Sequence, residues 1–114
     1  MYGIVVRESG AGVLVELWGE FDLFSLGNLR EALNNVLDLR RPIFVDLSGI
    51  TFLDLDSARE LAVRAQLYAH HLFLSNPSPW VTTSLQAFGL GGWIPFHPGA
   101  DHEEPPPVVS ETSS

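Results

Sequence analysis

The sequence contains neither cysteine nor lysine. Without cysteine the chain can form no disulfide, thiolate metal site or cysteine nucleophile, which fits a reducing compartment. Without lysine it can form neither a phosphate-binding loop ending in Gly-Lys-Ser/Thr nor a lysine Schiff base. These two absences exclude several large classes of enzyme.

Long apolar runs and clusters of basic residues are also missing. No apolar stretch approaches the ~18–20 residues that a membrane-spanning helix needs, and the first residues lack the charged head of a secretory signal. The net charge is −8 and the six basic residues are scattered arginines, whereas nucleic acid is bound through clustered basic side chains. We therefore expect a cytoplasmic protein that binds neither membrane nor nucleic acid.

The 114 residues are 46% apolar, which is enough for the core of one domain. The composition changes near residue 99, after which acidic residues, prolines and serines dominate. Such a segment has little apolar surface to bury and is typical of disorder. We expect a folded domain over residues 1–99 and a disordered acidic, proline-rich tail over residues 100–114.

The spacing of apolar residues predicts an α/β fold. Residues 2–8 and 13–18 alternate as strands around a glycine-containing turn, which predicts an antiparallel hairpin. Helical and strand periodicities then follow one another along the chain. The predicted elements are a helix over 25–39, a strand over 43–47, a helix over 55–69, a strand over 71–74, a helix from Ser78 to about Gly89, and an optional edge strand over 93–96.

The junction after residue 47 carries a cluster of polar residues where a helix is expected to begin. Asp54 can cap that helix, and Asp56 in its first turn gains roughly 0.3–1 kcal/mol from the helix dipole. Ser57 and Glu60 have the spacing of a capping box. The local sequence therefore explains these residues without a partner, although a helix start also favours added anions.

Four segments, in order, resemble the STAS domain, the module of bacterial anti-sigma-factor antagonists that also occurs in sulfate transporters. Residues 19–22 look like its Gly-Glu-apolar-Asp turn, and residues 45–54 closely match its strand-and-loop signature. Residues 76–81 and 88–90 resemble its later strand–helix junction and helix end. The resemblance covers residues 1 to about 97. It implies a mixed sheet of four to five strands with an N-terminal hairpin, packed against three to four helices.

The resemblance also implies a function. Anti-sigma-factor antagonists are non-enzymatic regulators that bind an anti-sigma factor or serine kinase near the start of the second helix, and a hydroxyl residue there is phosphorylated. In an ungapped match Leu55 replaces the first hydroxyl residue, Asp56 the phosphoacceptor and Ser57 the glycine. A phosphoserine carries about −1.5 to −2 charges against about −1 for an aspartate, so Asp56 is a partial mimic of the phosphorylated state.

Two further residues belong to this predicted partner-binding surface. Ser57 is the nearest hydroxyl, but a shift of one residue on a helix turns a side chain by about 100° away from the family geometry. It is the one candidate for phosphorylation. Asp22 lies in the turn that is near the switch loop in the family, and its alternative role is that of a turn or helix-start residue.

Other functions stay open on the sequence alone. The chain could be a phosphorylation-independent scaffold that associates with itself or with other STAS domains. It could also be a small ligand-binding domain or an acid-catalysed enzyme, which would need a deep pocket holding Asp22, Asp54 and Asp56. No nucleophile elbow or metal-ligand spacing is present, so we expect no catalysis, metal or cofactor.

Overall fold

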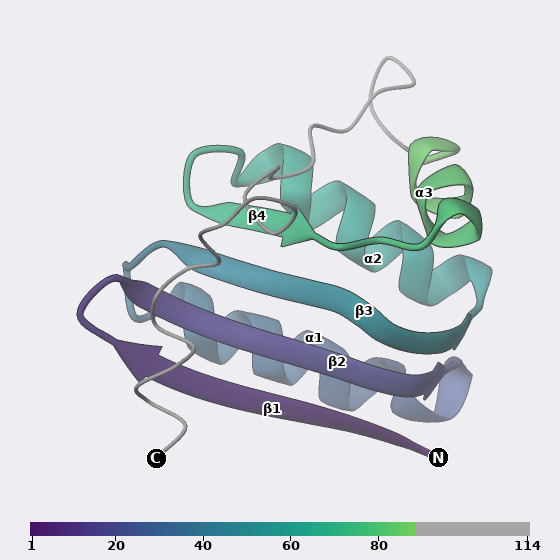
Figure 1. Cartoon of the computed structure of the whole chain (residues 1–114), viewed down its shortest axis with the longest axis horizontal. Helices are drawn as coiled ribbons and strands as arrows, with labels where there is room; N and C mark the ends of the chain where they lie inside the picture. The colour runs from purple at the N-terminus through teal and green to yellow at the C-terminus, as the bar shows by residue number, and fades with distance from the viewer. Residues whose placement is uncertain (89–114) are drawn as a thin grey trace.

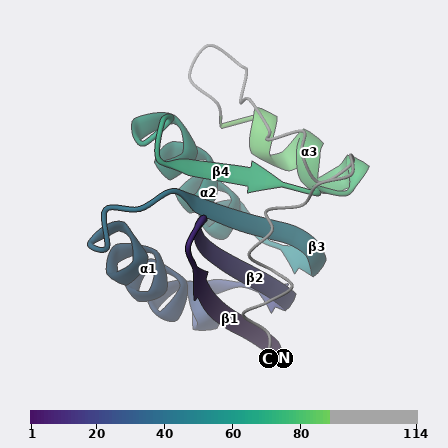
Figure 2. The same ribbon diagram turned by 60° about the vertical axis from the view of Figure 1, so that its left-hand side comes forward.

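The computed structural model describes residues 1–88, which form a four-stranded sheet with helices on one face (Figures 1 and 2). The strands lie in the order β1-β2-β3-β4, with β1 antiparallel to β2 and the other neighbours parallel. This mixed sheet and the N-terminal hairpin are as predicted. The elements are β1 (Tyr2–Ser9), β2 (Gly12–Phe21), α1 (Leu23–Leu37), β3 (Ile43–Leu53), α2 (Leu55–Leu67), β4 (Leu72–Ser75) and α3 (Pro79–Gln86).

The core lies between the sheet and the helices α1 and α2. One face of β2 and β3 is apolar and buried, and it meets the buried stripes of both helices. The stripe of α2 consists mainly of alanines, so this helix can approach the sheet closely. Helical spacing in the sequence predicts an inward stripe on each helix, and most of its members are buried: Leu26, Leu29, Leu33 and Val36 in α1, and Ala58, Leu61, Ala62 and Ala65 in α2. The last predicted members differ, because Leu37 is half-buried and both Tyr68 and Ala69 are exposed.

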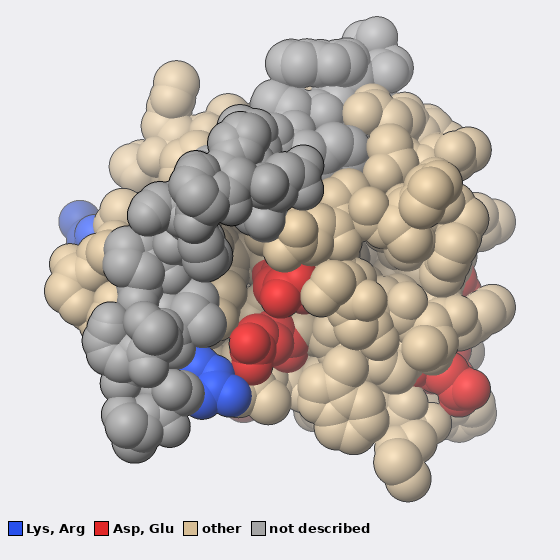
Figure 3. Space-filling view, viewed as in Figure 1, with Lys and Arg blue, Asp and Glu red and all other residues tan. Residues whose placement is uncertain are grey.

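The opposite face of the sheet is more polar and carries paired charges. Glu16 on β2 lies opposite Asp46 on β3, and Arg7 on β1 donates from Nε to Glu16 Oε1 at 3.3 Å. Figure 3 views this face and shows acidic side chains near its middle with a basic group beside them. None of the three helices covers this side of the sheet (Figure 2).

Two strands are longer than the sequence predicts. β2 continues through Phe21 and β3 through Leu53, whereas we expected β2 to stop near residue 18 and residues 48–54 to form a loop. The pairing of β2 with β3 shifts register twice, between Glu16 and Trp18 and between Gly19 and Glu20. Such irregularities break the two-residue alternation from which a strand is recognised. The last residues of β2 and β3 therefore have the sequence pattern of polar turns.

The helix boundaries also differ from the prediction. α1 starts at Leu23, two residues before the expected position, because Asp22 caps it, and it ends at Leu37. β4 is displaced by one residue from the predicted strand. The predicted start of α3 is confirmed, since Ser78 is its N-cap and Pro79 lies in its first turn. The predicted end of this helix near Gly89 is wrong, because α3 ends earlier, at Gln86, with Ala87 as its C-cap. The optional strand over 93–96 and the tail over 100–114 lie outside the described residues.

Membrane-spanning segments are not found among residues 1–88, where every helix is too short or too polar to cross a bilayer.

Gly19 is required by the geometry of the irregular end of β2. Its φ is +88°, and a Cβ added there would lie 2.3 Å from the carbonyl oxygen of Met1. We expect Gly19→Ala to lower the free energy of unfolding by about 1–3 kcal/mol, because the residue would be strained and would push against backbone. Gly10→Ala is the control, since a Cβ there meets no atom within 4 Å. Equal urea midpoints for the two variants would contradict this assignment.

Glu60 joins α1 to α2. Its carboxylate accepts from Arg30 Nε at 2.9 Å and from Arg64 Nε at 2.5 Å, and Arg64 Nη1 also donates to Asn34 Oδ1 at 2.7 Å. Burial raises the pKa of the Glu60 carboxyl, but the hydrogen bonds and positive charges of the two arginines outweigh it and hold the pKa below its ordinary value.

The lowered pKa of Glu60 makes its contribution to stability depend on pH. A group with a depressed folded-state pKa stabilises the fold above its unfolded pKa, and this is lost as the pH falls through the folded value. We expect Glu60→Gln to lower the free energy of unfolding by about 1–2 kcal/mol at neutral pH. In urea titrations the difference from wild type should shrink as the pH falls below the ordinary value of 4.5.

The control for this prediction is Glu31→Gln on the exposed side of α1, where the carboxylate makes no ion pair with residues 1–88. The control removes the same charge, so its stability should stay near that of wild type at each pH. A pH-independent loss in Glu60→Gln would show that the carboxylate charge is not what joins the helices.

Candidate functional site

The helices α1 and α2 begin side by side at one end of the sheet. Phe21 and Leu53 are paired at the ends of the parallel strands β2 and β3, and each strand leads directly into a helix. Asp54 N donates to the Phe21 carbonyl oxygen at 3.0 Å, which fixes the two junctions to each other. Figure 1 shows β2 and β3 ending at the same end of the sheet. Since Asp22 and Asp54 directly follow the paired residues Phe21 and Leu53, these two predicted residues come together there.

Asp22 is the N-cap of α1. Its Oδ1 accepts from the backbone N–H groups of Phe24 at 2.9 Å and Ser25 at 3.3 Å, while Ser25 Oγ accepts from Asp22 N at 2.9 Å. This reciprocal arrangement is a capping box with serine in the place of the usual glutamate. The Asp22 carboxylate thus accepts hydrogen bonds from the protein's own backbone, which is the alternative role of a helix-start residue given in the sequence analysis.

Asp54 has the corresponding position at the start of α2. Its Oδ1 accepts from Ser57 N at 2.8 Å, so the predicted cap is confirmed. The predicted capping box of Ser57 with Glu60 is wrong, because the cap is Asp54 and the Glu60 carboxylate is held by two arginines. Glu60 thus contributes to helix packing instead of capping.

Ser57 points into the protein. Its side chain is fully buried, and its hydroxyl has no hydrogen-bond partner among the described residues. A kinase acting on this conformation could not reach the hydroxyl. Phosphorylation of Ser57 stays an untested prediction, and its burial argues against it.

Asp56 is the one exposed member of the predicted cluster, whereas Asp22 and Asp54 are half-buried and Ser57 is buried. Asp56 lies in the first turn of α2, is exposed, and makes no hydrogen bond or ion pair with residues 1–88. Its charge interacts favourably with the N-terminal end of the helix dipole. Asp56 is therefore available to a partner, whereas Asp22 and Asp54 stabilise the helix starts.

Three exposed apolar side chains surround these caps and were missed by the sequence analysis. Leu23 and Leu55 are the first residues of α1 and α2, with exposed fractions of 67% and 71%, and Phe24 is 90% exposed. We call Leu23, Phe24 and Leu55 the apolar rim. The signal was present as a repeated triplet, since each cap follows a buried apolar residue and precedes a leucine: Phe21-Asp22-Leu23 and Leu53-Asp54-Leu55.

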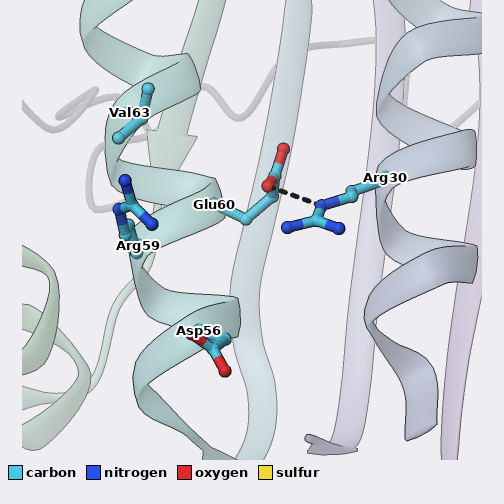
Figure 4. A pocket seen from close by; sticks show the side chains of 5 residues that line it. All are labelled: Arg30, Asp56, Arg59, Glu60 and Val63. Carbon is cyan, nitrogen blue, oxygen red and sulfur yellow. Dashed lines mark hydrogen bonds and ion pairs between the residues drawn. The ribbon is translucent and has the colours of Figure 1, made fainter. Parts of the chain in front are cut away.

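A charged hollow lies beside Asp56 between α1 and α2 (Figure 4). It is open to solvent, has a volume of about 240 Å³ and is lined by Arg30, Asp56, Arg59, Glu60 and Val63. Figure 4 shows Glu60 reaching from α2 towards Arg30 on α1, with Asp56 nearer the start of α2. Arg59 is exposed and makes no ion pair with the described residues. The hollow thus places an available cation close to the available carboxylate.

The arrangement differs from the deep acidic pocket that a ligand-binding domain or acid-catalysed enzyme would need. The hollow holds Asp56 but neither Asp22 nor Asp54, both of which are capping residues. Within residues 1–88 no group of three or more metal-ligating side chains comes together. The hollow therefore does not bring the three predicted carboxylates together.

Comparisons with known proteins identify the family and the fold. The model of the family described as Mlab, STAS domain, matches residues 4–96. A solved structure entitled the anti-sigma factor antagonist SpoIIAA in its unphosphorylated form superposes with a TM-score of 0.65 at 22% identity, over 87% of this chain and 91% of that one. No curated protein matches the chain in sequence. The family match covers most of the sequence, and the chain belongs to the STAS domain family.

Proposed function

We propose that this STAS domain is a non-enzymatic regulatory module in the cytoplasm that binds an anti-sigma factor or its serine kinase. The proposed contact surface consists of the apolar rim, Asp56 and the adjoining hollow. The observation that carries the proposal is the exposed carboxylate of Asp56, which has no partner within residues 1–88 and lies beside exposed apolar side chains.

The composition of this surface supports a protein partner. Exposed apolar patches with charged residues beside them are typical of protein interfaces, where aromatic side chains often supply much of the binding energy. Among the described residues, Phe24 is the most exposed large apolar side chain. A contact centred on Phe24 and Leu55 would bury apolar area and enclose Asp56 at its edge.

The fixed charge of Asp56 distinguishes the proposed mechanism from a reversible switch. In the STAS resemblance Asp56 occupies the position of the phosphorylated residue, and it has one carboxylate in place of a phosphate. The partner must then accept a permanent negative charge, which favours basic or hydrogen-bond-donating groups opposite Asp56. We propose that binding is set by this charge and does not require phosphorylation of Ser57.

Asp56→Arg tests the surface. We expect the affinity for an anti-sigma factor or kinase captured from the native cell to fall at least about tenfold, which corresponds to 1.4 kcal/mol, because a charge in the contact is reversed. Calorimetric titration measures the affinity. The control is Asp38→Arg, which makes the same change of charge at the exposed C-terminal end of α1. Unchanged affinity in Asp56→Arg would remove Asp56 from the interface.

Asp56→Ser tests the switch position. If the kinase recognises the STAS geometry, incubation with the captured kinase and ATP should add one phosphate to Asp56→Ser and none to wild type, as measured by intact mass. The variant Asp56→Ser/Ser57→Ala keeps only the introduced hydroxyl and should still be modified. Phosphate on wild type that is lost in Ser57→Ala would overturn the proposal that Ser57 is not used.

A further inference from the structure

The sheet has two edges among the described residues, and they differ. β4 forms one edge with four residues and is followed by Asn76 at φ 56° and then by Pro77, which has no N–H to offer. A short edge strand that ends at a proline is poorly suited to pairing with another strand. β1 forms the other edge with eight residues and pairs with β2 in one continuous register.

As far as residues 1–88 show, β1 lacks the usual protections of an edge strand. It contains no proline, no lysine and no bulge, and its middle is the apolar run Ile4-Val5-Val6. Its two charged side chains are already neutralised within the chain, since Arg7 pairs with Glu16 and Glu8 accepts from Arg41 Nη1 at 3.1 Å. Val6 is 44% exposed. In Figures 1 and 2 β1 is the outermost strand of the sheet on its side.

The hydrogen-bond phase of β1 determines which backbone groups face outward. Glu20 N donates to the Met1 carbonyl oxygen at 2.9 Å, so the Tyr2–Gly19 pair is of the non-hydrogen-bonded type. The odd-numbered residues of β1 therefore make the backbone hydrogen bonds to β2. The even-numbered residues direct their N–H and C=O groups away from the sheet: Tyr2, Ile4, Val6 and Glu8.

We propose that a second copy of this chain pairs with β1 through these outward groups, antiparallel and about a two-fold axis at Val5. In this register Val5 faces Val5 of the second copy, and Ile4 faces its Val6. Arg7 lies opposite Gly3, so no like charges face each other. Such an arrangement is self-complementary, as two-fold interfaces must be, and joins two four-stranded sheets into one of eight strands.

A register centred on Arg7 is less favourable, because it sets two guanidinium groups against each other. It would also leave Ile4 of each copy without a partner residue on the other β1. The net charge of −8 on each copy opposes association at low ionic strength. Salt should therefore strengthen the dimer. This interface is separate from the apolar rim and does not depend on the proposed function.

Light scattering over a concentration series of the full chain tests the proposal. We expect wild type to approach twice the 12.5 kDa mass of one chain as concentration rises, with the transition at lower concentration in added salt. Val6→Lys should remain at the mass of one chain, because it places a hydrated charge in the middle of the edge. Val6→Thr, which keeps the branched shape, should still dimerise.

Two measurements distinguish pairing through β1 from unfolding of the variant and from association through the apolar rim. Circular dichroism should show that Val6→Lys keeps the unfolding temperature of wild type within a few degrees, and Phe24→Ser/Leu55→Ser should still dimerise because the apolar rim is elsewhere. In amide exchange by nuclear magnetic resonance, protection of Ile4 and Val6 should rise with concentration, while that of Val5 is high throughout. A monomeric wild type, a dimeric Val6→Lys, loss of the dimer in Phe24→Ser/Leu55→Ser, or pairing of β1 with a strand of another protein would overturn the proposal.

Discussion

The parallel pairing of β2 with β3 is the constraint on which the rest of the structure depends. It brings the carboxyl ends of the two strands to one end of the sheet, where the hydrogen bond from Asp54 N to the Phe21 carbonyl oxygen holds them together. Both α1 and α2 then start at that end of the sheet. Because the chain steps in the same direction from β2 to β3 and from β3 to β4, right-handed crossovers place both helices on the same face. The proposed contact surface is thus a consequence of strand pairing, and its members come from segments far apart in the sequence.

The three acidic residues at the starts of α1 and α2 have two different roles. Asp22 and Asp54 satisfy backbone N–H groups that would otherwise lack partners at the helix starts. Asp56 is left with its charge free in the first turn of α2. In the proposed function this division separates stability from recognition, since Asp56 does not cap a helix and the two capping residues do. It also lets the surface change charge without loss of the helices.

Much of the fold and part of the site could be predicted from the sequence. The hairpin, the order of elements, the buried stripe of α2 and the cap at Asp54 all follow from local patterns. The continuation of β2 and β3 could not be predicted, because bulges near Gly19 disrupt the alternation. The inward direction of Ser57 and the pairing of Glu60 with Arg30 depend on how two helices pack, which no local pattern contains.

The antiparallel hairpin has a practical consequence at the N-terminus. Because Tyr2 pairs with Gly19, β1 begins at the same end of the sheet as the one at which β2 ends. The ring centroids of Tyr2 and Phe21 lie 5.4 Å apart. The Tyr2 hydroxyl accepts a hydrogen bond from the side-chain amide of Asn28 in α1. An affinity tag or fluorescent label attached before Met1 would therefore emerge beside the caps of α1 and α2 and shield them. Fusions intended for binding assays belong elsewhere on the molecule, for instance at the exposed Gly10-Ala11 turn at the far end of the hairpin.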